Sequence, residues 1–289
     1  MIASLVTALA LSTQAQNPML VSAQWLAEHA RDPNIVLLHV GPRPSYDSAH
    51  IAGAQYLAFT DIAVPRDTTQ PALELPAPAF FDSVLEARGI SNDSRIVIYQ
   101  SDEWFTPATR AYLTFYWAGL GARTSILDGG LAAWRRRGGA VTRDVPASRP
   151  RGNVTVTPRS DVVVSADYVA ANLDNPRVAI VDARNERFYL GNYPVRPDEP
   201  RPGHIPGAFN IPFPSIVADS QRLKTPADLR ILFEGAHAAP GDTIVAYCHI
   251  GQQATLVWFG AKLAGYDVRL YDGSFTQWSN LTRYQVERR

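Results

Sequence analysis

Short apolar runs alternate along the chain with longer segments in which apolar residues recur every three or four positions. The runs IVLLHV (35–40), RIVIY (95–99) and TIVAY (243–247) are apolar almost throughout, as is typical of parallel strands covered on both faces. The segments SAQWLAEHA, ATRAYLTFYWAGLGA and QATLVWFGAKLAGYD have helical spacing. Strands alternating with helices predict an α/β fold with mostly parallel sheets, flanking helices and right-handed crossovers.

The two halves of the chain repeat the same pattern. LVSAQWLAEHARDPNIVLLHVGPR leads to AHIAGAQYLAF in the first half, and VVSADYVAANLDNPRVAIVDARNER leads to GHIPGAFNIPF in the second. His50 matches His204, Tyr99 matches Tyr247 and Asp128 matches Asp272, at nearly equal separations. Loop insertions between two copies of one domain produce such small differences, so the chain is predicted to be a tandem duplication.

The proposed boundaries follow from the repeats and from composition. Residues 18–141 form the first predicted domain and residues 159–289 the second, with a linker rich in Pro and Arg at 142–158. The start, MIASLVTALALSTQAQ, has an apolar stretch too short to span a bilayer and fits a signal peptide over residues 1–17. We therefore expect export, in a bacterial cell to the periplasm, and a cytoplasmic location if this segment is not a signal.

Charge and cysteine content exclude several classes of function. Lys plus Arg and Asp plus Glu both number 27, and the isoelectric point is near 7.0. This balance argues against a partner nucleic acid or a stable association with membranes. One cysteine excludes an internal disulfide, and no Cys/His spacing resembles a zinc site. We expect a monomer that acts on small molecules.

The single cysteine, Cys248, follows the predicted strand TIVAY and precedes a predicted helix that starts near Gln252. Sites in open α/β folds lie at the carboxyl edge of the sheet. A short loop that closes into a helix directs backbone N–H groups inward, and these favour a thiolate. A lowered pKa and a nucleophilic role are therefore expected for Cys248. Gln100 takes the matching position in the first half, so the fold does not need a cysteine there for packing.

These motifs together resemble the tandem-domain rhodaneses, the thiosulfate and 3-mercaptopyruvate sulfurtransferase superfamily. The resemblance covers about residues 19–284 and rests on VAIVDARNERFYLG, GHIPGAFNIPF, IVAYCHIGQQAT and LYDGSFTQW. It implies an inactive first domain, a catalytic second domain and an active site between them. The implied reaction moves the sulfane sulfur of thiosulfate to cyanide or a thiol through a Cys248 persulfide, releasing sulfite, with no metal or organic cofactor.

The resemblance also implies roles for individual residues. Arg187 of RFYLG is expected to contact the sulfonate of the donor. Asp182 and Arg184 are expected to brace the site, and His204 to make structural hydrogen bonds in its turn. Asp272 and Ser274 should lie close to the cysteine loop, where Ser274 would donate a hydrogen bond to the persulfide or cap the following helix. The loop that binds substrate comprises Cys248, His249, Ile250, Gly251, Gln252 and Gln253.

The loop departs from both family patterns, which leaves alternatives open. Thiosulfate enzymes often carry Arg and Lys directly after the cysteine, and mercaptopyruvate enzymes carry a G-S-G stretch. His249 and Ile250 match neither, and the absence of a serine two residues after Cys248 favours thiosulfate over 3-mercaptopyruvate. A non-catalytic sulfur carrier or binding module stays a second alternative. A phosphatase of the C-x5-R type is disfavoured because Ala254 stands where its arginine would be. A cysteine hydrolase lacks a supporting histidine pattern.

Overall fold

The computed structural model describes residues 19–64, 73–101, 105–219 and 222–289. The predicted signal peptide, residues 1–17, lies outside them. In the first domain, a five-stranded sheet has the order β1-β6-β5-β2-β4, and every pairing in it is parallel. The strands are β1 (Leu20–Val21), β2 (Ile35–Val40), β4 (Gln55–Leu57), β5 (Arg95–Gln100) and β6 (Thr124–Leu127).

The second domain contains a parallel sheet with the same connectivity, in the order β10-β9-β13-β14-β8. Tyr99 pairs with His39 in the first sheet, and Tyr247 pairs with Asp182 in the second. The predicted duplication and the α/β class are therefore confirmed at the level of strand register. The strands are β8 (Val163–Val164), β9 (Val178–Asp182), β10 (Phe209–Asn210), β13 (Thr243–Tyr247) and β14 (Asp267–Tyr271).

Helices cover both faces of each sheet. The first domain has α1 (Ala23–His29), α2 (Arg43–Ser48), α3 (Phe59–Ile62), α4 (Pro78–Glu86), α5 (Thr106–Trp117) and α6 (Gly130–Arg136). The second has α7 (Ala166–Ala171), α8 (Glu186–Tyr189), α9 (Pro226–Glu234), α10 (Ala254–Leu263) and α11 (Ser274–Asn280). The helices α1 and α7 begin alike, since Ser22 and Ser165 each accept a hydrogen bond from the third residue on. Among the described residues no helix combines the length and apolar character needed to cross a bilayer.

The turn before β4 and its counterpart before β10 share the same histidine–tyrosine contact, which explains the repeated HI-x-GA motif. The Nδ1 atom of His50 lies 2.9 Å from the Tyr46 carbonyl oxygen, and Nδ1 of His204 lies 2.7 Å from that of Tyr189. Each histidine also stacks on its tyrosine ring at 3.9 Å. His204 thus makes the structural hydrogen bond that was expected of it within its turn.

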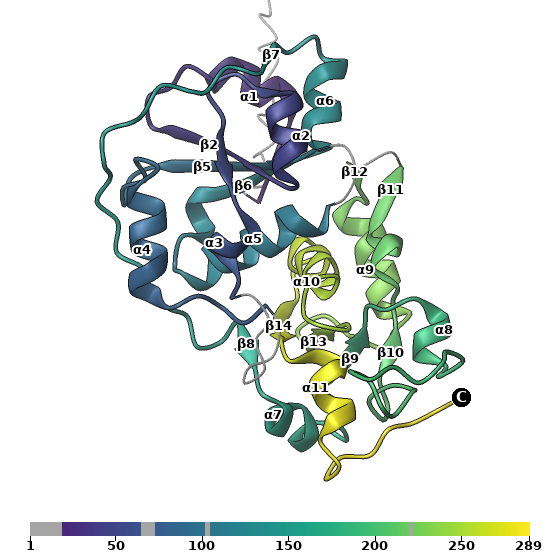
Figure 1. Ribbon diagram of the computed structural model, residues 1–289. Helices are drawn as coiled ribbons and strands as arrows, with labels where there is room; N and C mark the ends of the chain where they lie inside the picture. The colour runs from purple at the N-terminus through teal and green to yellow at the C-terminus, as the bar shows by residue number, and fades with distance from the viewer. Residues whose placement is uncertain (1–18, 65–72, 102–104, 220–221) are drawn as a thin grey trace, which may run out of the picture.

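The segment proposed as a linker, 142–158, lies against the first domain. Thr142 belongs to β7 (Val141–Thr142), which pairs antiparallel with β3 (His50–Ile51). Further along, the backbone of Gly152 bonds to Glu86 in α4, and Val154 is buried in the core. Figure 1 shows this segment running down the outside of the first domain to β8.

The two domains share one core. Apolar residues from α4 and α5 on the inner face of the first sheet, and from α9 and α10 on the inner face of the second, form a single cluster. The helices α5 and α10 lie side by side at its centre (Figure 1). The ring of Tyr112 meets that of Phe259 edge-on at 4.8 Å, and the hydroxyls of Thr109 and Thr255 lie 2.8 Å apart. This packing joins α10, the helix that follows the cysteine loop, to the first domain.

Candidate active site

Cys248 is the first residue after β13, and its side chain is 1% exposed. Strand β13 is central in its sheet, and α10 begins at Ala254, two residues later than predicted. The backbone N–H groups of Ile250, Gly251, Gln253 and Ala254 act on the sulfur so as to favour its charged form. The loop therefore directs its N–H donors at the sulfur, as its sequence predicts.

Helix α11 and Gly251 hold the loop in this shape. The N–H groups of Phe275 and Thr276 donate to the carbonyl oxygens of Cys248 and His249, at 2.9 and 3.0 Å. Gly251 has φ +82°, and a Cβ atom there would lie 2.1 Å from Oδ1 of Asp272. Both the left-handed conformation and the close approach require glycine.

Ser274 takes neither of the roles expected for it. Its Oγ accepts a hydrogen bond from the Cys248 backbone N–H at 3.1 Å and donates its proton to the Tyr271 carbonyl at 2.9 Å. The proton is therefore engaged within the fold rather than offered to a persulfide. The residue that caps α11 is Gly273, which has no side chain to accept a bond. Ser274 instead holds the backbone on which the cysteine sits.

The expected lowering of the Cys248 pKa is wrong in direction. Complete burial raises the pKa of the thiol, and the four N–H donors of the loop only oppose that effect. Burial penalises the charged form because the protein interior solvates it less well than water does. Any further negative charge beside the loop would raise the pKa again, so the charge balance around Cys248 decides how readily the thiolate forms.

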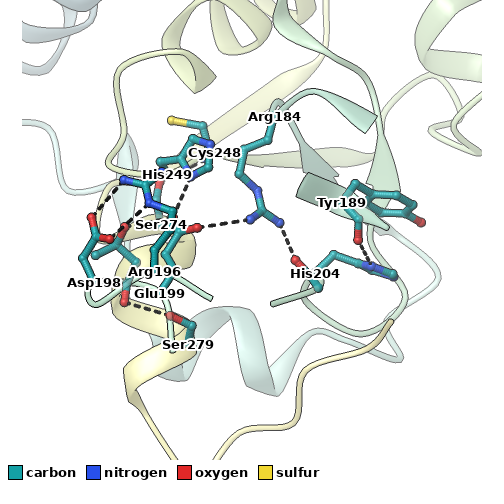
Figure 2. A network of polar contacts seen from close by, with 12 residues as sticks. Arg184, Tyr189, Arg196, Asp198, Glu199, His204, Cys248, His249, Ser274 and Ser279 are labelled. Carbon is teal, nitrogen blue, oxygen red and sulfur yellow. Dashed lines mark hydrogen bonds and ion pairs between the residues drawn. The ribbon is translucent and has the colours of Figure 1, made fainter. Parts of the chain in front are cut away.

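His249 is tied to an acidic residue that the sequence analysis did not single out. Its Nδ1 lies 2.6 Å from Oε1 of Glu199, which also accepts a hydrogen bond from Thr276. The second oxygen of Glu199 lies 3.8 Å from the Arg184 guanidinium. Figure 2 shows this network beneath the loop, with the Cys248 sulfur directed away from it. Glu199 lies in the Pro-rich stretch 194–202, where no periodicity marks it.

Asp182 and Arg184 form a buried ion pair, as expected of a brace. Arg184 Nη2 lies 2.6 Å from Asp182 Oδ2, and both side chains are at most 1% exposed. Arg184 also donates to the Gly203 carbonyl and lies 3.9 Å from the centre of the Phe275 ring. The pair thus joins the end of β9 to the GHIPG turn and to α11.

Arg187 is exposed on α8, and its guanidinium lies over the rings of Phe188 and Tyr193. No described carboxylate pairs with it. The Phe188 ring in turn meets the His249 ring edge-on at 4.5 Å. Arg187 is therefore an exposed cation on α8, the helix whose Phe188 ring packs against His249 of the cysteine loop.

Two of the remaining loop residues, Gln252 and Gln253, face the first domain. Gln252 and Gln253 line a cavity of about 340 Å³ together with Gln100 and Thr106. The Gln252 side chain donates to the Thr106 hydroxyl at 3.4 Å, while Ile250 is half-buried. The cysteine loop therefore adjoins the boundary between the domains.

Asp272 lies beside the loop as expected, but its partner comes from the other domain. Both oxygens of its carboxylate accept hydrogen bonds from Arg110 of α5, at 2.6 and 3.1 Å. Arg110 was not among the predicted site residues. One signal could have revealed it: a charged residue on a helix face that is otherwise apolar needs a partner when buried.

The first domain shows how the same framework looks without the site. Gln100 stands at the Cys248 position, and the strand register places His39 opposite the Asp182 position. Burial, with His50 nearby, lowers the pKa of His39 to about 4, so this position is neutral rather than acidic. At these two positions the first domain thus lacks the cysteine and the acidic residue of the second. In the described part of the chain no group of three or more acidic, His or Cys side chains could hold a metal.

Comparison with known proteins places both halves in one family. The rhodanese-like domain model matches residues 22–137 and again 165–281. The chain belongs to the rhodanese family. Its tandem arrangement, α/β fold and parallel sheets are those of a two-domain sulfurtransferase, which confirms the resemblance drawn from the sequence.

Individual relatives of this rhodanese differ in the activity their names carry. It is 33% identical to the sulfur carrier protein TtuD of Thermus thermophilus, over 91% of this chain and 94% of that protein. It is also 33% identical to the thiosulfate sulfurtransferase of Rattus norvegicus, over 90% and 91% of the two chains. The crystal structure of SseA from Escherichia coli, described among 3-mercaptopyruvate sulfotransferases, superposes with a TM-score of 0.75 at 28% identity, covering 88% and 98%.

Proposed function

We propose that this rhodanese is a thiosulfate sulfurtransferase that works through a persulfide on Cys248. The observation that carries the proposal is the set of loop N–H groups around the single cysteine, from Ile250, Gly251, Gln253 and Ala254, which we call the N–H cradle. In the first domain Gln100 stands at the position of the cysteine. A cysteine in the second domain and a glutamine at the same position of the first are expected of one catalytic and one inactive domain.

The reaction has two displacement steps. The Cys248 thiolate attacks the outer sulfur of thiosulfate, the bond between the two sulfur atoms breaks, and sulfite leaves with the electron pair. The terminal sulfur of the persulfide then bonds to cyanide or a thiolate, and the Cys248 thiolate is released. The loop N–H groups stabilise the anionic sulfur in both resting and persulfide states.

Two side chains are suited to the sulfonate of the donor. Arg187 has no carboxylate partner among the described residues and offers a fork of N–H donors. His249 directly follows the cysteine in the chain, but its Nδ1 atom is engaged by Glu199. His249 replaces the fixed cations usual in thiosulfate enzymes, so Arg187 is assigned the larger part of donor binding.

Steady-state kinetics with two donors test the assignment. We expect thiosulfate to give the higher kcat/KM with cyanide as acceptor, and 3-mercaptopyruvate to give a lower value. A higher kcat/KM for 3-mercaptopyruvate would assign the chain to the other sulfurtransferase class, which the similarity to SseA supports. If the persulfide forms but transfers its sulfur neither to cyanide nor to a small thiol, the result would favour a sulfur carrier, the activity named for the Thermus relative.

We further propose that the chain acts as an exported monomer. The export part of the proposal rests on the apolar stretch within residues 1–17. Expression of the full sequence in a Gram-negative host, followed by fractionation and mass measurement, tests it. A periplasmic product cleaved near Ala15 or Gln16 is expected, whereas a full-length cytoplasmic product would contradict export. Light scattering of the purified protein tests the oligomeric state.

A further inference from the structure

Arg110 connects the catalytically silent first domain to the cysteine loop. Its side chain is fully buried where α5 meets α10, and its guanidinium donates hydrogen bonds to both carboxylate oxygens of Asp272. The same group donates to the Gly251 carbonyl at 3.4 Å and to the Leu73 carbonyl. One cation from the first domain thus contacts the loop and the residue that buttresses it.

The Asp272 carboxylate disfavours a thiolate on Cys248, because both groups are buried and would carry negative charge. It is 2% exposed, and its carboxylate lies so close to Gly251 that a Cβ atom would overlap it. Gly251 supplies one of the N–H groups that favour the Cys248 anion. Burial raises the pKa of Asp272, and Arg110 counteracts this by stabilising the carboxylate.

Other charged groups surround this pair. The segment before α4 brings Glu74, whose pKa is raised first by burial and then by Asp272, and is lowered by Arg110. On the other side of the loop, His249 is paired with Glu199, and Arg184 with Asp182. Arg110 is therefore the cation that offsets both Asp272 and Glu74.

We propose that Arg110 is a positioning residue for sulfur transfer. By neutralising Asp272 and holding Gly251, it keeps the loop N–H groups on the Cys248 sulfur and shields the thiolate from a second negative charge. The inference rests on the proposed function of Cys248. It also gives the first domain a specific role, since its Arg110 provides the positive charge that neutralises Asp272 beside the cysteine loop of the second domain.

Replacing Arg110 and replacing Asp272 should shift the pKa of the Cys248 thiol in opposite directions. Arg110→Met leaves Asp272 without its cation beside the loop, so the thiolate is disfavoured. Asp272→Asn leaves the Arg110 cation unbalanced, so the thiolate is favoured. We expect alkylation of Cys248 at a fixed pH near 8 to slow about tenfold in the first variant, which corresponds to about one pH unit in the profile. It should become faster than wild type in the second.

The test measures the rate of Cys248 alkylation by iodoacetamide against pH, followed by intact mass. Because Cys248 is the only cysteine, the readout needs no sulfur donor and stands even if the proposed reaction is wrong. Arg110→Lys and the double variant Arg110→Met/Asp272→Asn should both restore a profile close to wild type. Thr109→Val is the matched control, because it removes an uncharged buried contact between the same two helices, and it should leave the profile unchanged.

Three outcomes would overturn the proposal. The first is an unchanged alkylation profile in both Arg110→Met and Asp272→Asn. The second is a double variant displaced as far as Arg110→Met alone. The third is a shift of equal size in Thr109→Val, which would indicate a packing effect. If Arg110→Met does not fold, Asp272→Asn and the double variant still carry the test, since the predicted acceleration in one must be absent in the other.

Discussion

Substituting Gly251 by alanine perturbs the cysteine loop at the point where it has least room. The new Cβ would lie 2.1 Å from Oδ1 of Asp272 and 2.9 Å from its backbone carbonyl oxygen. Asp272 is held by Arg110 and cannot retreat, so the loop must move. The φ of +82° adds about 1–2 kcal/mol of strain for a residue with a side chain.

The effect on rate follows from the N–H cradle. Four loop N–H groups face the Cys248 sulfur, and a displaced loop misdirects at least the one that belongs to residue 251. Loss of one donor to the resting thiolate raises the pKa of the thiol, and each unit of that rise lowers the thiolate fraction near neutral pH about tenfold. We therefore expect persulfide formation from thiosulfate to slow by at least about tenfold in Gly251→Ala.

Gly265→Ala separates the clash from the strain. Gly265 also has a positive φ, +93°, but nothing lies within 4 Å of its Cβ position. It follows α10 at the end remote from the cysteine. Both variants should lose similar stability through backbone strain, yet only Gly251→Ala should lose activity. Rapid quench with intact mass measures the rate, and a wild-type rate in Gly251→Ala would refute the role given to the cradle.

Three further predictions concern the thiol and its charged neighbours. Because burial raises the pKa of Cys248, alkylation of the wild-type thiol should keep accelerating above pH 9; a plateau below pH 8 in a stopped-flow profile would contradict this. Arg184→Met leaves Asp182 buried without its partner and should lower the free energy of unfolding by about 3–5 kcal/mol, with much of it recovered in Asp182→Asn/Arg184→Met. Chemical denaturation measures both, and an undiminished midpoint in Arg184→Met would show that the pair does not brace the site. Arg187→Ala should raise the KM for thiosulfate while leaving the unfolding midpoint unchanged, because its side chain is exposed; unchanged kinetics would remove its sulfonate role.

The duplicated fold could be predicted because its determinants are local. Apolar runs such as 35–40 and 243–247 mark strands wherever they occur, and Ser22 and Ser165 cap helices through bonds within their own turns. The matched tyrosines Tyr99 and Tyr247 even give the correct alignment of the two copies, which placed Gln100 opposite Cys248.

The charge balance of the site could not be predicted in the same way. Arg110 and Asp272 are 162 positions apart, and only the packing of α5 on α10 brings them together. The pKa of Cys248 depends on how deeply the loop is buried, which the local motif does not determine. Ser274 was expected to donate to the persulfide or to cap the following helix, but the turn at the end of β14 directs its hydroxyl to the backbone instead.

The most direct test of the central claim is the intact mass of the reduced protein after brief exposure to thiosulfate. We expect a gain of about 32 Da, one sulfur atom, that disappears on addition of cyanide. The Cys248→Ser variant should show no gain and should unfold at the same denaturant concentration as wild type. A wild-type chain that takes up no sulfur from thiosulfate, or a Cys248→Ser variant that still does, would contradict the account.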